Sequence, residues 1–308
     1  ALEIKNGDTL TNQKEKWSFK KLKTLHLELP EKENITHLDF LSEATNIENL
    51  KIYGGSGNKE GTCIKGLNSL LNLKFLSTSR LGFSKLDGIS KLKNLIYVKL
   101  TELYLEDISG LVNSKNLEFI DLSYSKILSD ITPIKKLKNI KLADFSATSL
   151  KSLSGLENSI DLIALKIART PIENLDVLLK HKNIRAVDAR QCYQLNSIKG
   201  LKNALNLNEI LLHESNQYSY NFESGKQELS KEGSLKNLEG IENCLELRTI
   251  TLSKTALTNL DPLIKCKKIF RNNYTKWDEE TPEWDGNTGS QDNPFWNVTE
   301  EVKKVGYG

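Results

Sequence analysis

The sequence predicts an α/β-type repeat solenoid: a curved stack of coils with a parallel β-sheet on its concave face and extended or 3-10 turns on its convex face. Three observations predict it. An apolar pattern recurs about every 22 residues, apolar and polar residues alternate at the start of each repeat, and glycine or proline interrupts its second half. One repeat cannot bury its own leucines, whereas stacked repeats bury them in a continuous core.

The repeats can be numbered from the first apolar residue of each alternating segment. The steps between these residues are 25, 26, 22, 22, 23, 22, 22, 23, 40 and 22 residues, which defines about eleven units. The markers are Leu22, Ile47, Leu73, Leu95, Leu117, Ile140, Leu162, Ile184, Leu207, Leu247 and Ile269. Only the first two units and one later insertion depart from the period.

Each unit begins like a strand and continues without room for a helix. In LEFIDL, residues 117–122, Leu117, Ile120 and Leu122 share the buried side of an extended segment, and Phe119 points to the other side. The second half of the unit has apolar residues every two or three positions and is broken by glycine or proline. Residues of this kind are Gly110, Pro133, Gly155, Gly200 and Pro262.

Composition restricts the kinds of partner. The 308 residues are 38% hydrophobic and 27% charged, as in a folded protein, and 43 basic against 40 acidic residues leave a formal charge of +3. This balance argues against nucleic acid or an anionic membrane as the default partner. No apolar run reaches the roughly 18 residues that span a bilayer, so no membrane insertion is expected. The chain starts at Ala1 and has no methionine, which indicates a processed or trimmed start and leaves the compartment open.

Both ends of the array are expected to be caps. Residues 1–18 are predicted to cap the N-terminus, residues 19–275 to form the array with an insertion at about 214–234, and residues 276–308 to form a tryptophan-rich C-terminal cap. The last segment holds Trp277, Trp284 and Trp296. A lid on the final coil explains these tryptophans, and a tryptophan-rich ligand site is the alternative.

Four stretches carry a family resemblance. DITPI at 130–134, EDISGL at 106–111, NLDPL at 259–263 and SIKGL at 197–201 resemble the leucine-rich repeats of bacterial internalin-like proteins, roughly from Phe19 to Tyr274. The resemblance implies a curved leucine-rich-repeat horseshoe and a non-enzymatic, protein-binding scaffold. It slightly favours a secreted or surface bacterial protein that binds a host receptor. One departure is clear, because hydroxyl or thiol residues replace the family's asparagine after the strand: Ser125, Thr148, Thr170, Cys192 and Thr255.

The outward positions of stacked strands form columns across the concave face. One column contains Phe75, Tyr97, Phe119 and Leu142 on four consecutive coils, which predicts one contiguous exposed apolar strip. Aromatic anchors dominate protein interfaces, so this strip is the predicted partner-binding site. The alternative is that the aromatics pack against each other, against a cap segment or against a loop folded over the face.

Charged residues lie beside the strip and are predicted to orient the partner. The next column mixes both signs, and Arg190 and Arg169 follow beyond it. Its charged members here are Lys99, Asp121, Asp144, Lys166 and Asp188. Asp121 and Asp144 are neighbours and could instead form a catalytic dyad with one raised pKa. No histidine or third carboxylate completes a catalytic or metal site, so an enzyme, a metal and a cofactor are not expected.

The insertion is a second candidate surface. Tyr218, Tyr220 and Phe222 alternate within NQYSYNF, which predicts an extended arm or hairpin with aromatics on one side. Long insertions in repeat proteins often map to the binding face. A solvated loop is the alternative.

Cysteine usage adds one open question. The four cysteines contain no CxxC pair, but Cys244 and Cys266 hold the same place in adjacent units and are either bonded or two free thiols. The chain is thus predicted to be a monomeric, non-enzymatic module that binds a protein partner on its concave face. A cytoplasmic inhibitor or immunity protein that blocks a toxin or enzyme is the alternative, and a regulatory subunit of a phosphatase-like enzyme is a distant third. The start of the intact gene would discriminate between the first two.

Overall fold

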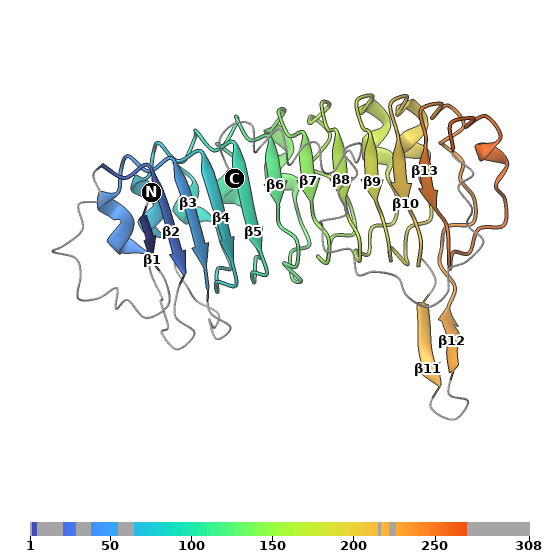
Figure 1. Cartoon of the computed structure of the whole chain (residues 1–308), viewed down its shortest axis with the longest axis horizontal. Helices are drawn as coiled ribbons and strands as arrows, with labels where there is room; N and C mark the ends of the chain where they lie inside the picture. Colours follow the sequence, from blue (N-terminus) through green and yellow to red (C-terminus); the bar gives the residue numbers. More distant parts are fainter. Residues whose placement is uncertain are drawn as a thin grey trace.

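The structure, a computed structural model, describes residues 2–4, 21–28, 38–54, 65–214, 217–221 and 226–269. Within these residues a single parallel sheet contains 11 strands in the order β1-β2-β3-β4-β5-β6-β7-β8-β9-β10-β13. The strands lie side by side in one layer along the whole array (Figure 1). They are β1 (Leu2–Ile4), β2 (Thr24–Glu28), β3 (Asn49–Tyr53), β4 (Phe75–Ser79), β5 (Tyr97–Thr101), β6 (Phe119–Asp121), β7 (Leu142–Asp144), β8 (Ala164–Lys166), β9 (Ala186–Asp188), β10 (Glu209–Leu211) and β13 (Thr249–Thr251).

Short 3-10 turns occupy the opposite side of the coils, and the described residues contain no α-helix. The turns are η3 (Asp39–Glu43), η4 (Lys65–Ser69), η5 (Asp87–Ile89), η6 (Ser109–Leu111), η7 (Thr132–Lys136), η8 (Asp176–Lys180), η9 (Lys199–Asn203) and η10 (Asp261–Leu263). The predicted fold class, a leucine-rich-repeat solenoid with a parallel sheet and 3-10 turns, is confirmed. Glycine and proline prevent a regular helix here, as expected.

The core is one continuous stack of aliphatic side chains between the sheet and the turns. Leu76, Val98 and Ile120 are register partners on adjacent strands, and each is at most 1% exposed. Phe83 and Phe145 are the largest fully buried side chains and fill the stack where the chain leaves the strand. Each coil completes the apolar surface of its neighbours, which is why the repeats fold only as an array.

Asparagines tie consecutive coils together just before the strands. Asn94 donates its side-chain N–H to the carbonyl of Leu71 at 2.9 Å, and Asn139 donates to that of Lys115 at the same distance. Asn72 and Asn206 make equivalent bonds to Thr45 and Lys182. The sequence pattern raised the question of an asparagine ladder after the strands, whereas the structure has one before them.

The threonines after the strands bond the backbone of their own coil. Thr148 donates to the carbonyl of Phe145 at 2.7 Å, Thr170 to that of Ile167 at 2.6 Å, and Thr255 to that of Leu252 at 2.8 Å. A threonine therefore closes the turn within one coil. Cys192 occupies the same place in its coil, but its thiol donates to the carbonyl of Ile167 on the preceding coil at 3.0 Å.

A close approach between coils explains one glycine. A Cβ atom on Gly110 would lie 1.7 Å from the carbonyl oxygen of Leu86 on the preceding coil. No other residue fits there without separating the coils. The adjoining Asp107 accepts the backbone N–H of Ser109 at 2.7 Å, which sets the turn that the D-I-S sequence encodes.

The insertion forms a hairpin, which confirms one of the two predicted forms. β11 (Gln217–Asn221) and β12 (Lys226–Lys231) pair as a separate antiparallel sheet. The hairpin projects beyond the C-terminal ends of the sheet strands (Figure 1). Strand β13 continues the parallel register of β10 directly, with Glu209 opposite Thr249, so the insertion leaves the array undisturbed.

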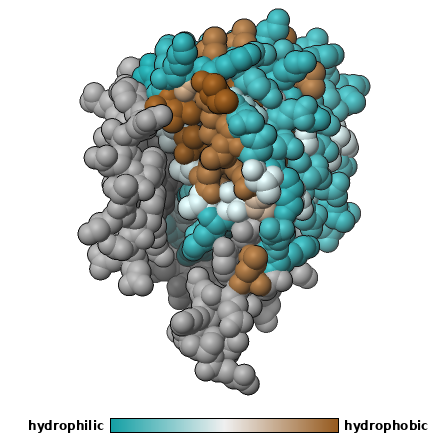
Figure 2. Space-filling view, turned by 90° about the vertical axis from the view of Figure 1, so that its right-hand side faces the viewer, coloured by the Kyte–Doolittle hydropathy of each residue, from teal (hydrophilic) through white to brown (hydrophobic). Residues whose placement is uncertain are grey.

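The two ends of the array differ. Strand β1 lies in the predicted N-terminal cap and adds a parallel strand to β2. At the other end, Figure 2 shows apolar residues gathered on the last described coil, where Leu260 is 52% and Ile264 is 75% exposed. The predicted C-terminal cap of residues 276–308 and the strand of the eleventh unit lie outside the described residues, so both stay predictions.

Candidate functional site

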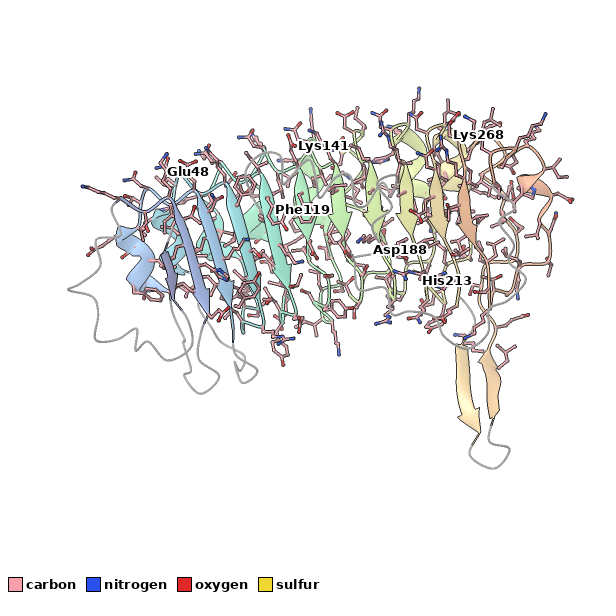
Figure 3. The ribbon with its side chains drawn as sticks, in the orientation of Figure 1. Glu48, Phe119, Lys141, Asp188, His213 and Lys268 are labelled. Carbon is pink, nitrogen blue, oxygen red and sulfur yellow. The ribbon has the colours of Figure 1, made fainter. Side chains whose placement is uncertain are left out.

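The predicted outward column is present in the predicted register. Phe75 lies opposite Tyr97, Tyr97 opposite Phe119, and Phe119 opposite Leu142 on strands β4 to β7. We call these four residues the aromatic row. The rings of Tyr97 and Phe119 stack with centroids 4.2 Å apart and planes 4° apart, and those of Phe75 and Tyr97 are 6.0 Å apart. Figure 3 labels Phe119 in the middle of the sheet.

The row is less exposed than the sequence predicted. The three aromatic residues are partly exposed and Leu142 is only 8% exposed, so the expectation of a contiguous exposed strip is wrong at Leu142. Mutual stacking removes ring faces from solvent, and Leu142 packs in a small cluster with Ala164, Ala186 and Phe119.

Burial, and next the charge of Asp121, raises the pKa of Tyr97. The phenol is therefore neutral at physiological pH and presents a hydroxyl that can donate one hydrogen bond. It is the polar handle within an otherwise apolar row.

Two aspartates lie beside the row on adjacent strands. Asp121 and Asp144 are register partners, and each accepts the backbone N–H of the residue two positions on, Ser123 at 3.0 Å and Ser146 at 2.9 Å. Lys99 pairs with Asp121 at 3.4 Å. Burial, followed by the neighbouring charge of Asp121, raises the pKa of Asp144 to about 6, as the alternative interpretation of these two aspartates suggested.

Further along the sheet, Asp188 and Arg190 hold each other. The guanidinium donates to both carboxylate oxygens, from Nε to Oδ1 at 2.9 Å and from Nη2 to Oδ2 at 2.7 Å. Asp188 is 2% exposed, so this bidentate pair is largely desolvated. The sequence pattern placed both residues at the site but did not reveal that they neutralise one another.

Beside this pair lie groups that the sequence interpretation missed. His213 Nδ1 lies 2.7 Å from Thr251 Oγ1 on β13. Burial, and next the charge of Arg190, lowers the pKa of His213, so the imidazole is neutral at pH 7. Burial and Asp188 raise the pKa of Glu209. The contact between His213 and Thr251 could have been found only by aligning units across the insertion. Asp188 and His213 lie on neighbouring coils near the strand ends (Figure 3).

Arg169 belongs to a polar ladder at the corner where the strands end. Its Nε donates to Gln191 at 2.7 Å, Gln191 donates to Glu214, and Lys254 pairs with Glu214 at 3.6 Å. All four residues have positive φ angles between 54° and 60°. Arg169 is thus held by its neighbour in the next coil.

The remaining predicted residues divide between two places. Lys166 lies on β8 opposite Asp144, and its charge offsets part of the rise in the pKa of that carboxyl group. Tyr218 and Tyr220 lie on β11 of the hairpin, which follows β10, well along the array from the aromatic row. Phe222 lies outside the described residues. The structure therefore brings together the aromatic row and the carboxylate pair but not the hairpin residues.

The described part of the chain was also searched for metal sites, membrane-spanning helices and reactive thiols. No group of three or more His, Cys, Asp and Glu side chains there is arranged to hold a metal ion. No helix there is long and apolar enough to cross a membrane. Cys192, Cys244 and Cys266 are free and buried. Burial raises the pKa of Cys192 to about 11 and that of Cys244 to about 12, so both are unreactive thiols.

Comparison with known proteins places the fold. No family model and no curated protein matches the sequence. Among solved structures, an internalin of Listeria monocytogenes aligns over 82% of this chain and 86% of its own, with 19% identity and a TM-score of 0.50. An internalin C2 of the same species covers 63% and 82%, with 18% identity and a TM-score of 0.53. A leucine-rich-repeat protein of Leptospira interrogans covers 81% and 65%, with 17% identity and a TM-score of 0.60. The chain therefore has the leucine-rich-repeat solenoid fold of these proteins.

Proposed function

We propose that this chain is a recognition module that binds a protein partner on the concave face of its sheet, with the aromatic row as the apolar anchor. The observation that carries the proposal is the stack of Phe75, Tyr97 and Phe119 in register on a face that points away from the core. Stacked aromatics with partly accessible rings offer apolar area at a small entropic cost.

The carboxylate pair adds a preference to this anchor. Asp144 is held in place by Ser146, lies next to a second carboxylate and carries a raised pKa. A cationic side chain from a partner would relieve the repulsion between the two carboxylates and replace the water around them. We therefore propose that the partner presents a Lys or Arg side chain beside an apolar one, with Asp188 and Arg190 at the polar rim.

Two double variants test the anchor. Tyr97→Ala with Phe119→Ala is expected to weaken partner binding by about 2 to 4 kcal/mol, as truncation of interface anchors does. The matched control is Tyr104→Ala with Tyr124→Ala, because these tyrosines are 46% and 49% exposed but lie off the row. Unchanged affinity in the row variant, with cooperative unfolding retained, would remove the proposal.

The setting of this function has two candidate forms. By analogy with the internalin fold, one is a secreted or surface bacterial protein whose partner is a host receptor. The second is a cytoplasmic inhibitor or immunity protein that blocks a toxin or enzyme. Cys244 and Cys266, which lie in adjacent coils as free thiols, favour the second because a reducing compartment preserves such thiols. Determining the start of the intact gene tests this choice, since a signal peptide supports the first form.

A further inference from the structure

A column of lysine and aliphatic residues runs along the edge of the array where the strands begin. Its members precede the first core residue of each coil by two positions. In seven coils the same backbone bond fixes them, for example from the N–H of Lys93 to the carbonyl of Lys91 at 3.0 Å. We call the column the edge row; its described members are Thr45, Leu71, Lys93, Lys115, Lys138, Ile160, Lys182, Leu205, Leu245 and Lys267.

The edge row is a rigid feature of the fold. Asn94, Asn116 and Asn139 each donate to the carbonyl of an edge-row residue on the preceding coil, namely Leu71, Lys93 and Lys115. The spacing of the row is therefore set by the stacking of the coils, about 4.8 Å per step at the sheet.

Both kinds of side chain in the edge row face solvent. The lysines are exposed, and none forms an ion pair with another described residue. Leu71 is 53% exposed, Ile160 51%, and Leu205 and Leu245 54% each. A single exposed aliphatic side chain is ordinary, but three leucines and one isoleucine in a column whose other members are five lysines and one threonine form a pattern that solvation does not explain.

The surroundings strengthen the positive charge of this edge. A second line of exposed lysines lies two residues before the row, at Lys91, Lys136, Lys180 and Lys265. Most acidic residues nearby are neutralised: Glu48 pairs with Lys74, Glu118 with Lys141 and Glu246 with Lys268. Glu157 pairs with Lys135, and Asp161, Glu43 and Glu242 are further carboxylates near this edge. In Figure 3, Lys141 and Lys268, the partners of Glu118 and Glu246, lie along this edge.

We infer that the edge row docks the protein on the surface of an anionic lipid bilayer. Lysines spaced along a straight edge match the phosphates of a headgroup layer, and the exposed leucines and isoleucine match the apolar boundary just beneath it. A polyanionic rod such as nucleic acid or a sulfated glycan would satisfy the lysines and leave the aliphatic side chains in water. The overall charge of +3 conceals this segregation, which is why composition argued against membranes.

Docking by this edge is compatible with recognition on the sheet face. The hairpin leaves the array at the opposite edge, where the strands end, and the aromatic row lies on the face between the two edges (Figure 1). The bilayer would therefore leave both candidate protein-binding surfaces accessible. The inference does not depend on the proposed protein partner.

Vesicle sedimentation with the full chain tests it. The probes are phosphatidylcholine vesicles with and without phosphatidylserine. Binding is expected only to the anionic vesicles and should weaken with salt. Replacing Lys93, Lys115 and Lys138 by serine should reduce binding on the order of 100-fold, at roughly fivefold per lysine. The control replaces Lys85, Lys126 and Lys151, which are exposed lysines far from this edge, and should bind as the wild type does.

A second variant separates the bilayer from other polyanions. Leu205→Ser with Leu245→Ser is expected to lower vesicle binding several-fold with the same salt dependence, because it removes apolar contact and no charge. Equal vesicle binding by the wild type and the three-lysine serine variant would overturn the inference. So would failure of the wild type to bind anionic vesicles, or tighter binding to heparin or RNA that the leucine replacements leave unchanged.

Discussion

At the scale of single residues, the ionised form of Asp144 is destabilised by burial and by the neighbouring charge of Asp121. Its carboxylate is partly buried beside Asp121, and its pKa rises to about 6. An unfolded aspartate has a pKa near ~3.9. Between these values the folded state binds the proton more tightly than the unfolded state, so protonation of Asp144 stabilises the fold. This contribution is present at low pH and is lost as pH rises through about 6.

Replacing Asp144 by asparagine should therefore stabilise the protein at neutral pH. Asparagine keeps an oxygen for the N–H of Ser146 and removes the repulsion with Asp121. We expect a gain of about 1 kcal/mol at pH 7, after allowing for partial solvation of the carboxyl group, and no gain near pH 4. Denaturant unfolding of both proteins at the two pH values measures it. A variant that is less stable than the wild type at pH 7 would contradict this assignment of the charge.

The same residue links stability to the proposed function. If a partner cation binds the ionised carboxylate pair, the affinity should fall as pH drops below about 6, the pKa of Asp144. Titration of the partner at pH 7.5 and 5, with Asp144→Asn as the control, checks this. The variant should bind more weakly at pH 7.5 and show less pH dependence, and an identical pH profile in both proteins would exclude Asp144 from the contact.

At the scale of the coil, close contact between neighbours governs which substitutions the array tolerates. Gly110→Ala would place a Cβ atom 1.7 Å from the carbonyl oxygen of Leu86, so the two coils must separate. We expect a loss of about 2 to 4 kcal/mol in the free energy of unfolding. The neighbouring Val112→Ala should cost less than about 1.5 kcal/mol, because it only shortens a partly exposed side chain. Equal unfolding midpoints for the two variants would show that the coils are not packed this closely.

The hairpin is an element added to a coil rather than a part of the core. The register passes directly from β10 to β13, and Glu214 on one side of the insertion already bonds the backbone of Ser253. Replacing residues 217–231 by a short Gly-Ser loop should change the free energy of unfolding by less than about 1 kcal/mol, since loop-closure entropy varies slowly with length. Thermal or denaturant unfolding checks this expectation. A large loss would mean that the hairpin supports the array.

The strands and their register could be predicted well from the sequence, whereas the contacts between their side chains could not. The spacing of Phe75, Tyr97, Phe119 and Leu142 was enough to place them in one column, because side chains alternate strictly in a strand. Their exposure was not predictable, since it depends on how the rings stack. The pairing of Asp188 with Arg190 was likewise hidden, because Arg190 lies beyond the end of β9, where strand alternation no longer fixes the direction of a side chain.

At the scale of the whole molecule, stacking of the coils places equivalent positions of the sequence repeat side by side, so that each position forms a column of side chains. Several apolar positions per coil make the core, one outward position makes the aromatic row, and one turn position makes the edge row. Period and alternation identify these positions in the sequence, so the fold was predictable. The basic edge was not noticed from the sequence, because the lysines follow the repeat only once the turns are aligned and the overall charge is nearly neutral.

The central claim is that a protein partner binds at the aromatic row, and affinity capture tests it most directly. The intact chain, the variant with Tyr97 and Phe119 replaced by serine, and the variant with Tyr104 and Tyr124 replaced by serine would each be exposed to bacterial and host lysates. All three should first be shown to unfold cooperatively. The account predicts one partner that the intact chain and the second variant capture and the first variant loses. Capture of the same partner by all three proteins would contradict it.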